Sequence, residues 1–274
     1  MAMIINTNIS AIAAQNSLTI SSLNQQTAME RLSSGLRINN AKDDAAGLAI
    51  STRMTAAIRG IDAAIRNAND GISATQTAEG SLAAIQDSLQ RIRELAVQSA
   101  NDTNGAADHT SLNTEAQALL TEINRVVSVT KFNNVGLIDG SFSGKSIQVG
   151  SSNSTNDAIT VTISKADTST LGVNSISLTT TAGSQSALGL LDSALDTVTT
   201  ARSSMGAYQN QLNAAITNLS NTTLNLQASR SRILDTDYAK ETTKLAKAQI
   251  IQQAATAMLA QANQSSQTVL ALLK

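Results

Sequence analysis

The side chains best suited to catalysis or metal binding are few, and their spacing forms no recognised reactive set. His109 is the single histidine and Cys is absent, whereas a zinc site needs three or four His, Cys or carboxylate ligands. The HExxH pattern of zinc proteases is also absent. We therefore expect His109 to be a solvated loop residue, and we expect no metal site and no cofactor.

The segment GSFSGKS at 140–146 imitates a phosphate-binding loop. That motif needs four residues between its glycines and a helix after it. Here three residues separate Gly140 from Gly144, and strand-like Ile147 and Val149 follow. We interpret the segment as a flexible turn and expect no nucleotide site.

Two pairs of carboxylates stand close together in the sequence, Asp43 with Asp44 and Asp235 with Asp237. Each pair precedes a predicted helix, where a carboxylate accepts hydrogen bonds from free backbone N–H groups and interacts favourably with the helix dipole. Capping is therefore the expected role. Since no nucleophile, base and orienting group occur together, we expect no enzymatic activity.

Charge is missing from both ends of the chain. Neither 1–29 nor 248–273 contains an Asp, Glu, Lys, Arg or His. A buried unpaired charge costs several kcal/mol, so a helix enclosed on all sides is expected to lack charge. Frequent Ser, Thr, Asn and Gln, and the absence of a run of about 18 apolar residues, argue against membrane spans. We expect both ends to be buried against copies of the same chain.

The composition favours thin helical bundles. Trp, Cys and Pro are absent, and there are only two Phe and two Tyr, so the core must use Ala, Leu, Ile and Val. Without Pro, long helices can continue uninterrupted. The formal net charge is −1 and aromatic residues are scarce, which disfavours nucleic-acid binding. The first basic residue is Arg31, so the N-terminus does not read as a secretory signal.

Apolar residues recur in steps of three and four toward both ends, as in the heptad seam of a coiled coil. Near the C-terminus the seam residues are small or polar, so partner helices could pack closely against them. The pattern predicts a polymer interface built from both ends of the chain. The predicted residues are Ile5, Ile9, Ile12, Leu23, Leu245, Ala248, Ala255, Leu259, Ala262, Val269 and Leu273.

The middle of the sequence predicts further helices and a small β-rich insert. Helical spacing covers about 44–100, 112–126 and 188–233, with a turn at 101–108. Gly60, Gly71 and Gly80 each cost a helix about 1 kcal/mol relative to Ala, so we interpret them as close-packing sites. From 131 to about 186 the apolar residues alternate as in strands, which predicts short hairpins.

These elements predict a mainly α protein. We expect an elongated antiparallel helical bundle or coiled coil with a small β-hairpin insert, and we expect the termini to pair as two helices. The predicted domains are discontinuous: 1–43 with 231–274, 44–140 with 187–230, and the short β-rich surface insert 141–186.

Several long, ordered strings occupy both halves of the chain. They are INTNISAIAAQNSL at 5–18, ERLSSGLRINNAKDDAAGLAIS at 30–51, RIRELAVQSAND at 91–102, SRILDTDYAKET at 231–242 and AQANQSSQTVLALL at 260–273. Together these strings resemble bacterial flagellin. The resemblance implies a structural subunit that is exported unfolded through the flagellar type III apparatus. It also implies self-assembly into the extracellular filament of the bacterial flagellum, which drives swimming.

The same resemblance implies where each region lies. The termini would form the inner tube of the filament, the neighbouring helices the outer tube, and the insert would face solvent. The short insert indicates a member with little or no extra outer domain. Partners implied by the resemblance are many copies of the same chain, a filament cap, hook-junction proteins and an export chaperone.

One stretch resembles the region that the host flagellin-sensing Toll-like receptor reads. The string RIRELAVQSAN contains Arg91 and Leu95, and Glu115 on the return helix completes the pattern. From the residues alone, Arg91 and Glu115 would be solvated charges and Leu95 part of the bundle core. The resemblance instead implies receptor recognition of the dissociated monomer at these positions.

Alternative functions remain open at this point. The hook–filament junction protein shares parts of both termini but usually carries a larger middle region. A secreted adhesin or enzyme on a helical stalk is a more remote alternative, since the insert has no recognisable catalytic set. The Ser- and Thr-rich segment 141–186 serves solubility or carries O-linked glycans, and no acceptor motif decides between these readings.

Overall fold

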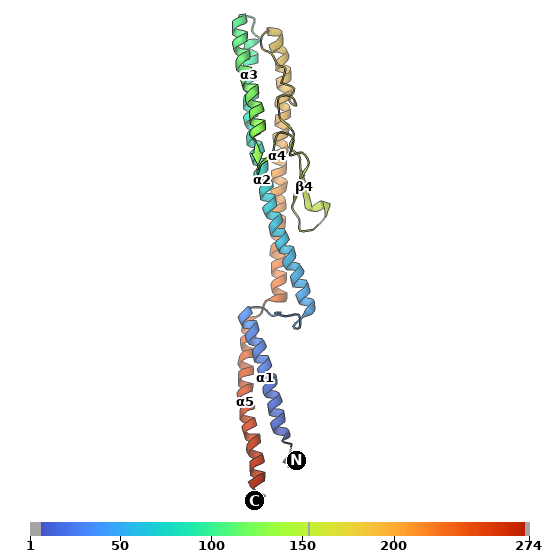
Figure 1. Ribbon diagram of the computed structural model, residues 1–274, viewed down its shortest axis with the longest axis vertical. Helices are drawn as coiled ribbons and strands as arrows, with labels where there is room; N and C mark the ends of the chain where they lie inside the picture. Colours follow the sequence, from blue (N-terminus) through green and yellow to red (C-terminus); the bar gives the residue numbers. More distant parts are fainter. Residues whose placement is uncertain (1–6, 153, 272–274) are drawn as a thin grey trace. The chain divides into compact units, whose positions relative to one another are not determined.

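The computed structural model describes residues 7–152 and 154–271, and these are mainly helical (Figure 1). The helices are α1 (Ile9–Ser34), α2 (Ala45–Ser99), α3 (Ala106–Val129), α4 (Thr181–Leu234) and α5 (Tyr238–Ala271). Between α3 and α4 lie β1 (Lys131–Phe132), β2 (Val135–Gly136), β3 (Lys145–Gln148), the 3₁₀ turn η1 (Thr155–Asp157) and β4 (Ala158–Val161). The prediction of a mainly α protein with small β hairpins is confirmed.

The chain divides into two compact units. The terminal unit comprises Met1–Ala56 with Asn225–Lys274, and the central unit comprises Ala57–Leu224. Helices α2 and α4 each contribute residues to both units. The predicted three-part division, with 141–186 as a separate surface insert, stays a prediction.

The terminal unit consists mainly of α1 and α5, which run antiparallel along each other (Figure 1). Arg31 near the end of α1 pairs with Glu241 near the start of α5, and Ser21 bonds to Ala248 further along. The contact is narrow because its buried positions are small: Ala28, Ala248, Ala255 and Ala262. The prediction that the terminal helices pair is confirmed.

Capping residues define both ends of α1. The Asn8 side chain accepts a hydrogen bond from the Ala11 amide at 3.1 Å, which satisfies one of the free donors of the first turn. Gly35 ends the helix in the left-handed region, at φ 72°, and its amide donates to the Arg31 carbonyl at 2.9 Å. Glycine adopts this conformation without the steric cost that a Cβ brings, so the helix stops here.

A backbone bridge follows these caps and joins the two ends of the terminal unit. The Arg37 amide donates to the Leu234 carbonyl at 2.7 Å, and the Thr236 amide donates to the Gly35 carbonyl at 3.0 Å. The segments after α1 and after α4 are thus paired antiparallel. This pairing explains why α5 starts beside the end of α1.

The central unit has an aliphatic core between α2, α3 and α4. Helix α2 contains 55 residues, which at about 1.5 Å per residue is a rod of about 80 Å. Buried core side chains from these helices include Leu82, Ile85, Leu89, Ile92, Ile123, Leu191, Met205 and Leu212. Fully burying each such side chain contributes about 1.5–3 kcal/mol, so the core depends on many aliphatic contacts in place of a few large aromatic ones.

Two short hairpins follow α3. Strands β1 and β2 pair antiparallel around Asn133 and Asn134, whose φ angles are 46° and 64°. Positive φ at both central residues is the requirement of a type I′ turn, and Asn tolerates it better than most residues. Strands β3 and β4 pair antiparallel with Ile147 opposite Ile159, which confirms the strand-like alternation expected there.

Two of the three helix glycines pack closely, as predicted. A Cβ at Gly60 would lie 2.8 Å from the Ser151 Cβ, and one at Gly71 would lie 2.5 Å from the Ile147 Cδ1. Both glycines thus let the β3 region approach α2. The prediction is wrong for Gly80, because a Cβ there would meet nothing within 4 Å.

The irregular segment 162–180 joins the core through its apolar residues. The buried residues of this segment include Ile163, Ala166, Leu171, Val173, Ile176 and Leu178. The Asn113 Oδ1 atom on α3 accepts from the Leu178 amide at 2.9 Å, and Asn124 exchanges hydrogen bonds with Thr168. These amide side chains satisfy backbone groups that have no strand partner.

Two helices begin earlier than the sequence predicted. The predicted turn runs to Asp108, but α3 already begins at Ala106, with Gly105 as its N-cap. The predicted return to helix is at Leu188, whereas α4 begins at Thr181. Its first turn carries mainly polar residues, so apolar spacing could not reveal it, although the Thr180 hydroxyl accepts from the Gly183 amide at 3.1 Å as a cap.

Candidate self-association interface

Helix α1 leaves large apolar side chains uncovered. Of the predicted interface residues on this helix, Ile9 is 68% exposed, Ile12 is 57% exposed and Leu23 is 58% exposed. Ile20 and Met29 are also exposed. Predicted Ile5 lies outside the described residues. A helix with this many exposed aliphatic side chains and no charge over its first three quarters is suited to burial against another protein surface.

The predicted seam on α5 faces α1 of the same chain. Ala248, Ala255 and Ala262 are buried, while Leu245 and Leu259 are half-buried. The Ala248 carbonyl accepts from Ser21, and the Ala262 carbonyl accepts from Asn8 at 2.9 Å. The side chain of Val269 and all of Leu273 lie outside the described part. The assignment of these residues to the polymer interface stays a prediction.

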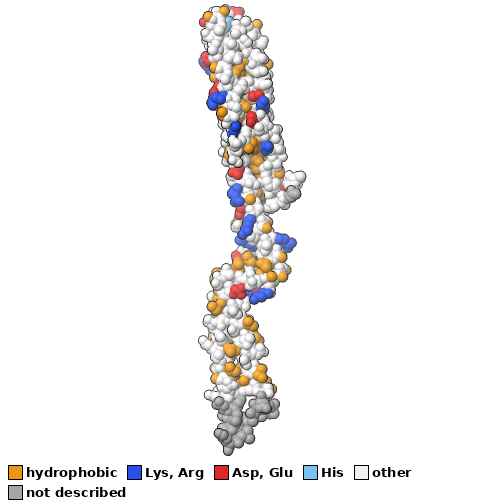
Figure 2. All heavy atoms as spheres, in the orientation of Figure 1, with side chains coloured by type: hydrophobic (Ala, Val, Ile, Leu, Met, Phe, Trp, Pro, Cys, Tyr) orange, Lys and Arg blue, Asp and Glu red, His pale blue; other side chains and the backbone are white. Residues whose placement is uncertain are grey.

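Further apolar side chains on α5 lie outside that seam. Ile250 and Met258 are 65% and 64% exposed, and Ile251 is 40% exposed. Sequence reasoning missed these residues because it followed the stronger heptad seam. The sequence did contain a signal for them, because they are large apolar residues at positions of this helix that do not belong to the seam. Figure 2 shows hydrophobic side chains among uncharged polar ones over this part of the molecule, with charged side chains gathered over other segments.

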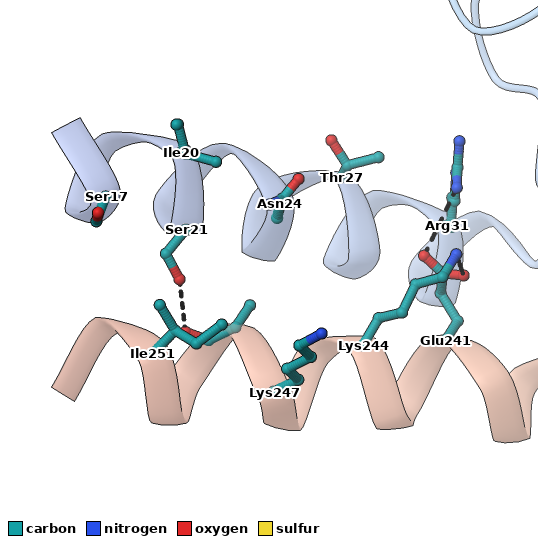
Figure 3. A pocket seen from close by; sticks show the side chains of 11 residues that line it. Ser17, Ile20, Ser21, Asn24, Thr27, Arg31, Glu241, Lys244, Lys247 and Ile251 are labelled. Carbon is teal, nitrogen blue, oxygen red and sulfur yellow. Dashed lines mark hydrogen bonds and ion pairs between the residues drawn. The ribbon is translucent and has the colours of Figure 1, made fainter. Parts of the chain in front are cut away.

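A groove of about 550 Å³ runs between α1 and α5 (Figure 3). At one end Glu241, which is buried, accepts from Lys244 Nζ at 2.9 Å, and Arg31 Nη1 lies 3.7 Å from its other oxygen. Lys247 also lines the groove, while Ser17, Ser21 and Asn24 supply uncharged polar groups. The groove therefore joins the uncharged length of the helix pair to a basic end.

The residues of the predicted receptor pattern differ in their exposure. Arg91 Nε and Nη2 donate to Glu115 Oε1 at 3.0 and 2.9 Å, and both side chains are about half exposed. The hydrogen bond to Glu115, aided by one to Glu94, raises the pKa of Arg91. Leu95 is only 1% exposed and packs in the core. The structure thus joins Arg91 and Glu115 at the surface and does not present Leu95 there.

The expectation for His109 is wrong. It lies on α3 and is 7% exposed, with Nδ1 2.7 Å from the Ser99 hydroxyl. Ser99 in turn donates to the Leu178 carbonyl at 2.8 Å and accepts from Ser184 at 2.9 Å. Because α3 starts earlier than predicted, its first turns bring His109 against α2. The histidine joins three segments of the central unit through a buried hydrogen-bond network.

The paired carboxylates act mainly as caps. Asp44 Oδ1 accepts from the Gly47 amide at 2.8 Å at the start of α2, and Asp237 Oδ1 accepts from the Ala239 amide at 3.0 Å at the start of α5. Asp43 caps the preceding turn instead, accepting from two backbone amides. Asp235 lies in the backbone bridge opposite Leu36.

Other kinds of site find little support in the described residues. No group of three or more His, Cys, Asp or Glu residues is arranged to hold a metal ion among them. The former phosphate-loop candidate forms a turn with positive φ at Gly140 and Gly144 and then enters β3. Within 7–152 and 154–271, no helix has the length and hydropathy needed to cross a bilayer.

Comparison with known proteins agrees with this picture of a self-associating helical protein. The model of the bacterial flagellin N-terminal helical region matches residues 5–143, and that of the C-terminal helical region matches residues 188–273. A flagellin from Halalkalibacterium halodurans is 47% identical over 274 residues, covering 99% of this chain and 100% of the relative. A flagellin from Xenorhabdus nematophila is 43% identical over 315 residues, covering 100% of both chains.

Solved structures share the fold. The crystal structure of Bacillus cereus flagellin is 30% identical, covers 56% of this chain and 88% of its own, and superposes with a TM-score of 0.51. A putative flagellar hook-associated protein from Vibrio parahaemolyticus covers 70% of this chain and 100% of its own, with a TM-score of 0.59. Its identity is 13%, so this likeness shows the fold alone.

The helix pair with its uncharged apolar faces and the helical central unit define a structural protein that polymerises. The chain belongs to the bacterial flagellin family. It is a subunit that self-assembles into the extracellular filament of the bacterial flagellum. Nothing in the comparisons favours the hook–filament junction protein or the stalked adhesin or enzyme.

Proposed function

We propose that the outward faces of α1 and α5 form the main contact between copies of this chain in the filament. On α1 this surface contains Ile9, Ile12, Ile20 and Leu23, and on α5 it contains Ile250 and Met258. We call these six residues the outward apolar surface. The seam residues Ala248, Ala255 and Ala262 support it indirectly by holding α5 against α1.

The observation that carries this proposal is the coincidence of exposed aliphatic side chains with an absence of charge. All six side chains are at least half exposed, and neither 1–29 nor 248–273 carries an ionisable side chain. Burying apolar surface contributes about 25 cal/mol per Å², and no charge has to be desolvated to gain it. If each helix pair contacts several neighbouring subunits, the free energies of burying apolar surface at these contacts add up.

The regions take their places in the filament accordingly. Residues 1–43 with 231–274 form the inner tube, 44–140 with 187–230 form the outer tube, and 141–186 faces outward. The support is that the ionisable side chains lie between 30 and 247 and at 274, as expected if only the terminal segments are enclosed. In this function Asp44 and Asp237 act as helix caps, and His109 serves a structural hydrogen-bond network.

A charge introduced into the outward apolar surface tests the proposal. Ile250→Glu would place an ionised side chain in a contact that excludes water, which costs several kcal/mol. We expect the purified variant to keep its helical content and to remain as monomers under seeded conditions that polymerise the parent chain. Ile250→Gln introduces a side chain of the same size as Glu without its charge, so it shows how much of the effect is due to charge. Ser143→Glu, on the proposed outer surface, serves as the control. Normal filaments from Ile250→Glu would contradict the proposal.

Further partners follow from family membership. The filament would grow beneath a cap, join the hook through junction proteins, and depend on an export chaperone before secretion. For the dissociated monomer we propose recognition by the host flagellin-sensing Toll-like receptor through Arg91, Leu95 and Glu115. The exposed Arg91–Glu115 pair supplies a charged contact, and buried Leu95 would act by fixing the position of Arg91 one turn away on α2.

A further inference from the structure

The groove between α1 and α5 has an unusual balance of charge. Its lining includes three basic side chains, Arg31, Lys244 and Lys247, against a single carboxylate, Glu241. These residues border segments that carry no ionisable side chain at all. Positive charge is thus concentrated at one end of an otherwise neutral helix pair.

The single carboxylate is already engaged. Glu241 is 4% exposed and holds Lys244 at 2.9 Å, with Arg31 at 3.7 Å. The Nε atom of Arg31 is buried and has no hydrogen-bond partner among the described residues. Within 7–152 and 154–271 no hydrogen bond or ion pair reaches the Lys247 ammonium group, whose side chain extends from α5 into the space between the helices (Figure 3). Basic side chains therefore outnumber carboxylates in this groove, three to one.

Assembly would make this imbalance costly. Ile20 and Ile251 line the same groove and are both exposed, and Lys247 lies one helical turn from Ile251, so a neighbour that covers them reaches the first of the basic residues (Figure 3). This step rests on the proposed function of the outward apolar surface. Enclosing cations without counter-charge carries a desolvation penalty of several kcal/mol per ion, which a bound anion would offset.

We propose that the groove is an oxyanion site. A carboxylate or phosphate-like group accepts charge-assisted hydrogen bonds from Lys247 and Lys244, with Arg31 beside it. The oxyanion comes either from inorganic phosphate in the medium or from an acidic side chain of a second copy. Binding neutralises the basic end when subunits close over it, so occupancy of the groove strengthens the filament.

Inorganic phosphate is the first probe. Filaments are sedimented with increasing concentrations of radiolabelled phosphate at constant ionic strength, and bound label is measured per subunit. The first test variant combines Lys244→Gln with Lys247→Gln. The second is Lys247→Gln alone, which removes only one of the two lysines. The matched control is Lys240→Gln, an exposed lysine on α5 outside the groove lining. We expect saturable label with the parent chain and the control, and loss of label with the test variants.

The second arm measures the critical concentration for assembly without phosphate. If no label sediments, a critical concentration raised about tenfold in Lys247→Gln, which leaves the Lys244–Glu241 pair intact, and unchanged in Lys240→Gln identifies a neighbour's carboxylate as the source. Equal label in all variants, or no label together with unchanged assembly, would overturn the proposal. Failure of the parent chain to polymerise would instead count against the proposed function, so the two failures are distinguishable.

Discussion

The Ser21 hydroxyl on α1 donates a 2.7 Å hydrogen bond to the Ala248 carbonyl on α5, linking positions 227 residues apart in sequence. Both residues are buried. The contact shows that the heptad seam of α5 is already occupied within one chain. We therefore expect a neighbouring subunit to contact the outward side chains of the two helices in place of the seam.

Removing this hydroxyl should weaken the helix pair. Ser21→Ala loses one intramolecular hydrogen bond, worth about 0.5–1.5 kcal/mol, but gains a few tenths in helix propensity. Ser22→Ala, at the adjacent exposed position, makes the same propensity change without losing the contact. Filament melting by calorimetry should be lower for Ser21→Ala than for Ser22→Ala. Equal melting temperatures would show that the bond contributes nothing.

Two glycines should respond in opposite directions to the same substitution. Gly35 has φ 72°, and a Cβ there would lie 3.0 Å from the Tyr238 hydroxyl, so Gly35→Ala should cost about 1–2 kcal/mol. Gly189 lies inside α4, and a Cβ there would meet nothing within 4 Å, so Gly189→Ala should stabilise by up to about 1 kcal/mol. Thermal unfolding of both variants checks the signs. A stabilising Gly35→Ala would refute the capping role of this glycine.

The turn before α2 should respond to acid. Hydrogen bonds from the Asn40 and Asn39 amides lower the pKa of Asp43 from its ordinary value of 3.8. Because the folded pKa is the lower one, this stabilisation is present above pH 3.8 and is lost as pH falls through the folded value. Carbon NMR of the Asp43 carboxyl should show a midpoint below 3.8, and Asp43→Asn should abolish this acid response. A midpoint at or above 3.8 would contradict the assignment.

Receptor recognition should depend on the Arg91–Glu115 pair. The triple change Arg91→Ala, Leu95→Ala and Glu115→Ala should abolish signalling by monomer in a receptor reporter assay. Arg91→Ala alone should reduce it without altering helical content, since the pair is exposed and worth little to stability. Arg125→Ala removes a comparable surface pair with Glu122 and serves as the control. Full signalling by the triple variant would exclude the proposed site.

Much of the fold was predictable because the spacing of apolar residues in the sequence matches the helices and strands that pack in the structure. Helix α2 runs over Ala45–Ser99, close to the predicted 44–100, since its apolar spacing is regular throughout. The alternation of Ile147, Ile159 and Val161 correctly indicated strands. The starts of α3 and α4 were missed because their first turns contain no large apolar side chain, so apolar periodicity contains no signal there.

The site was harder to predict for a different reason. Ile9 and Ile12 are exposed, as an interface with other copies would require, but the Ala248 seam is buried inside one chain. A heptad pattern states that a helix packs against something and does not state which partner. His109 illustrates the same limit, because its hydrogen-bond partner Ser99 lies across the turn between α2 and α3, and Ser99 is itself bonded to Leu178, which is far along the chain.

A helical reconstruction of the assembled filament by electron cryomicroscopy is the most direct test of how this chain functions. We expect Ile12 on α1 and Ile250 and Met258 on α5 to be covered by neighbouring subunits, with the uncharged ends enclosed around the filament axis. A reconstruction in which these side chains face bulk water on the outer surface would contradict this expectation.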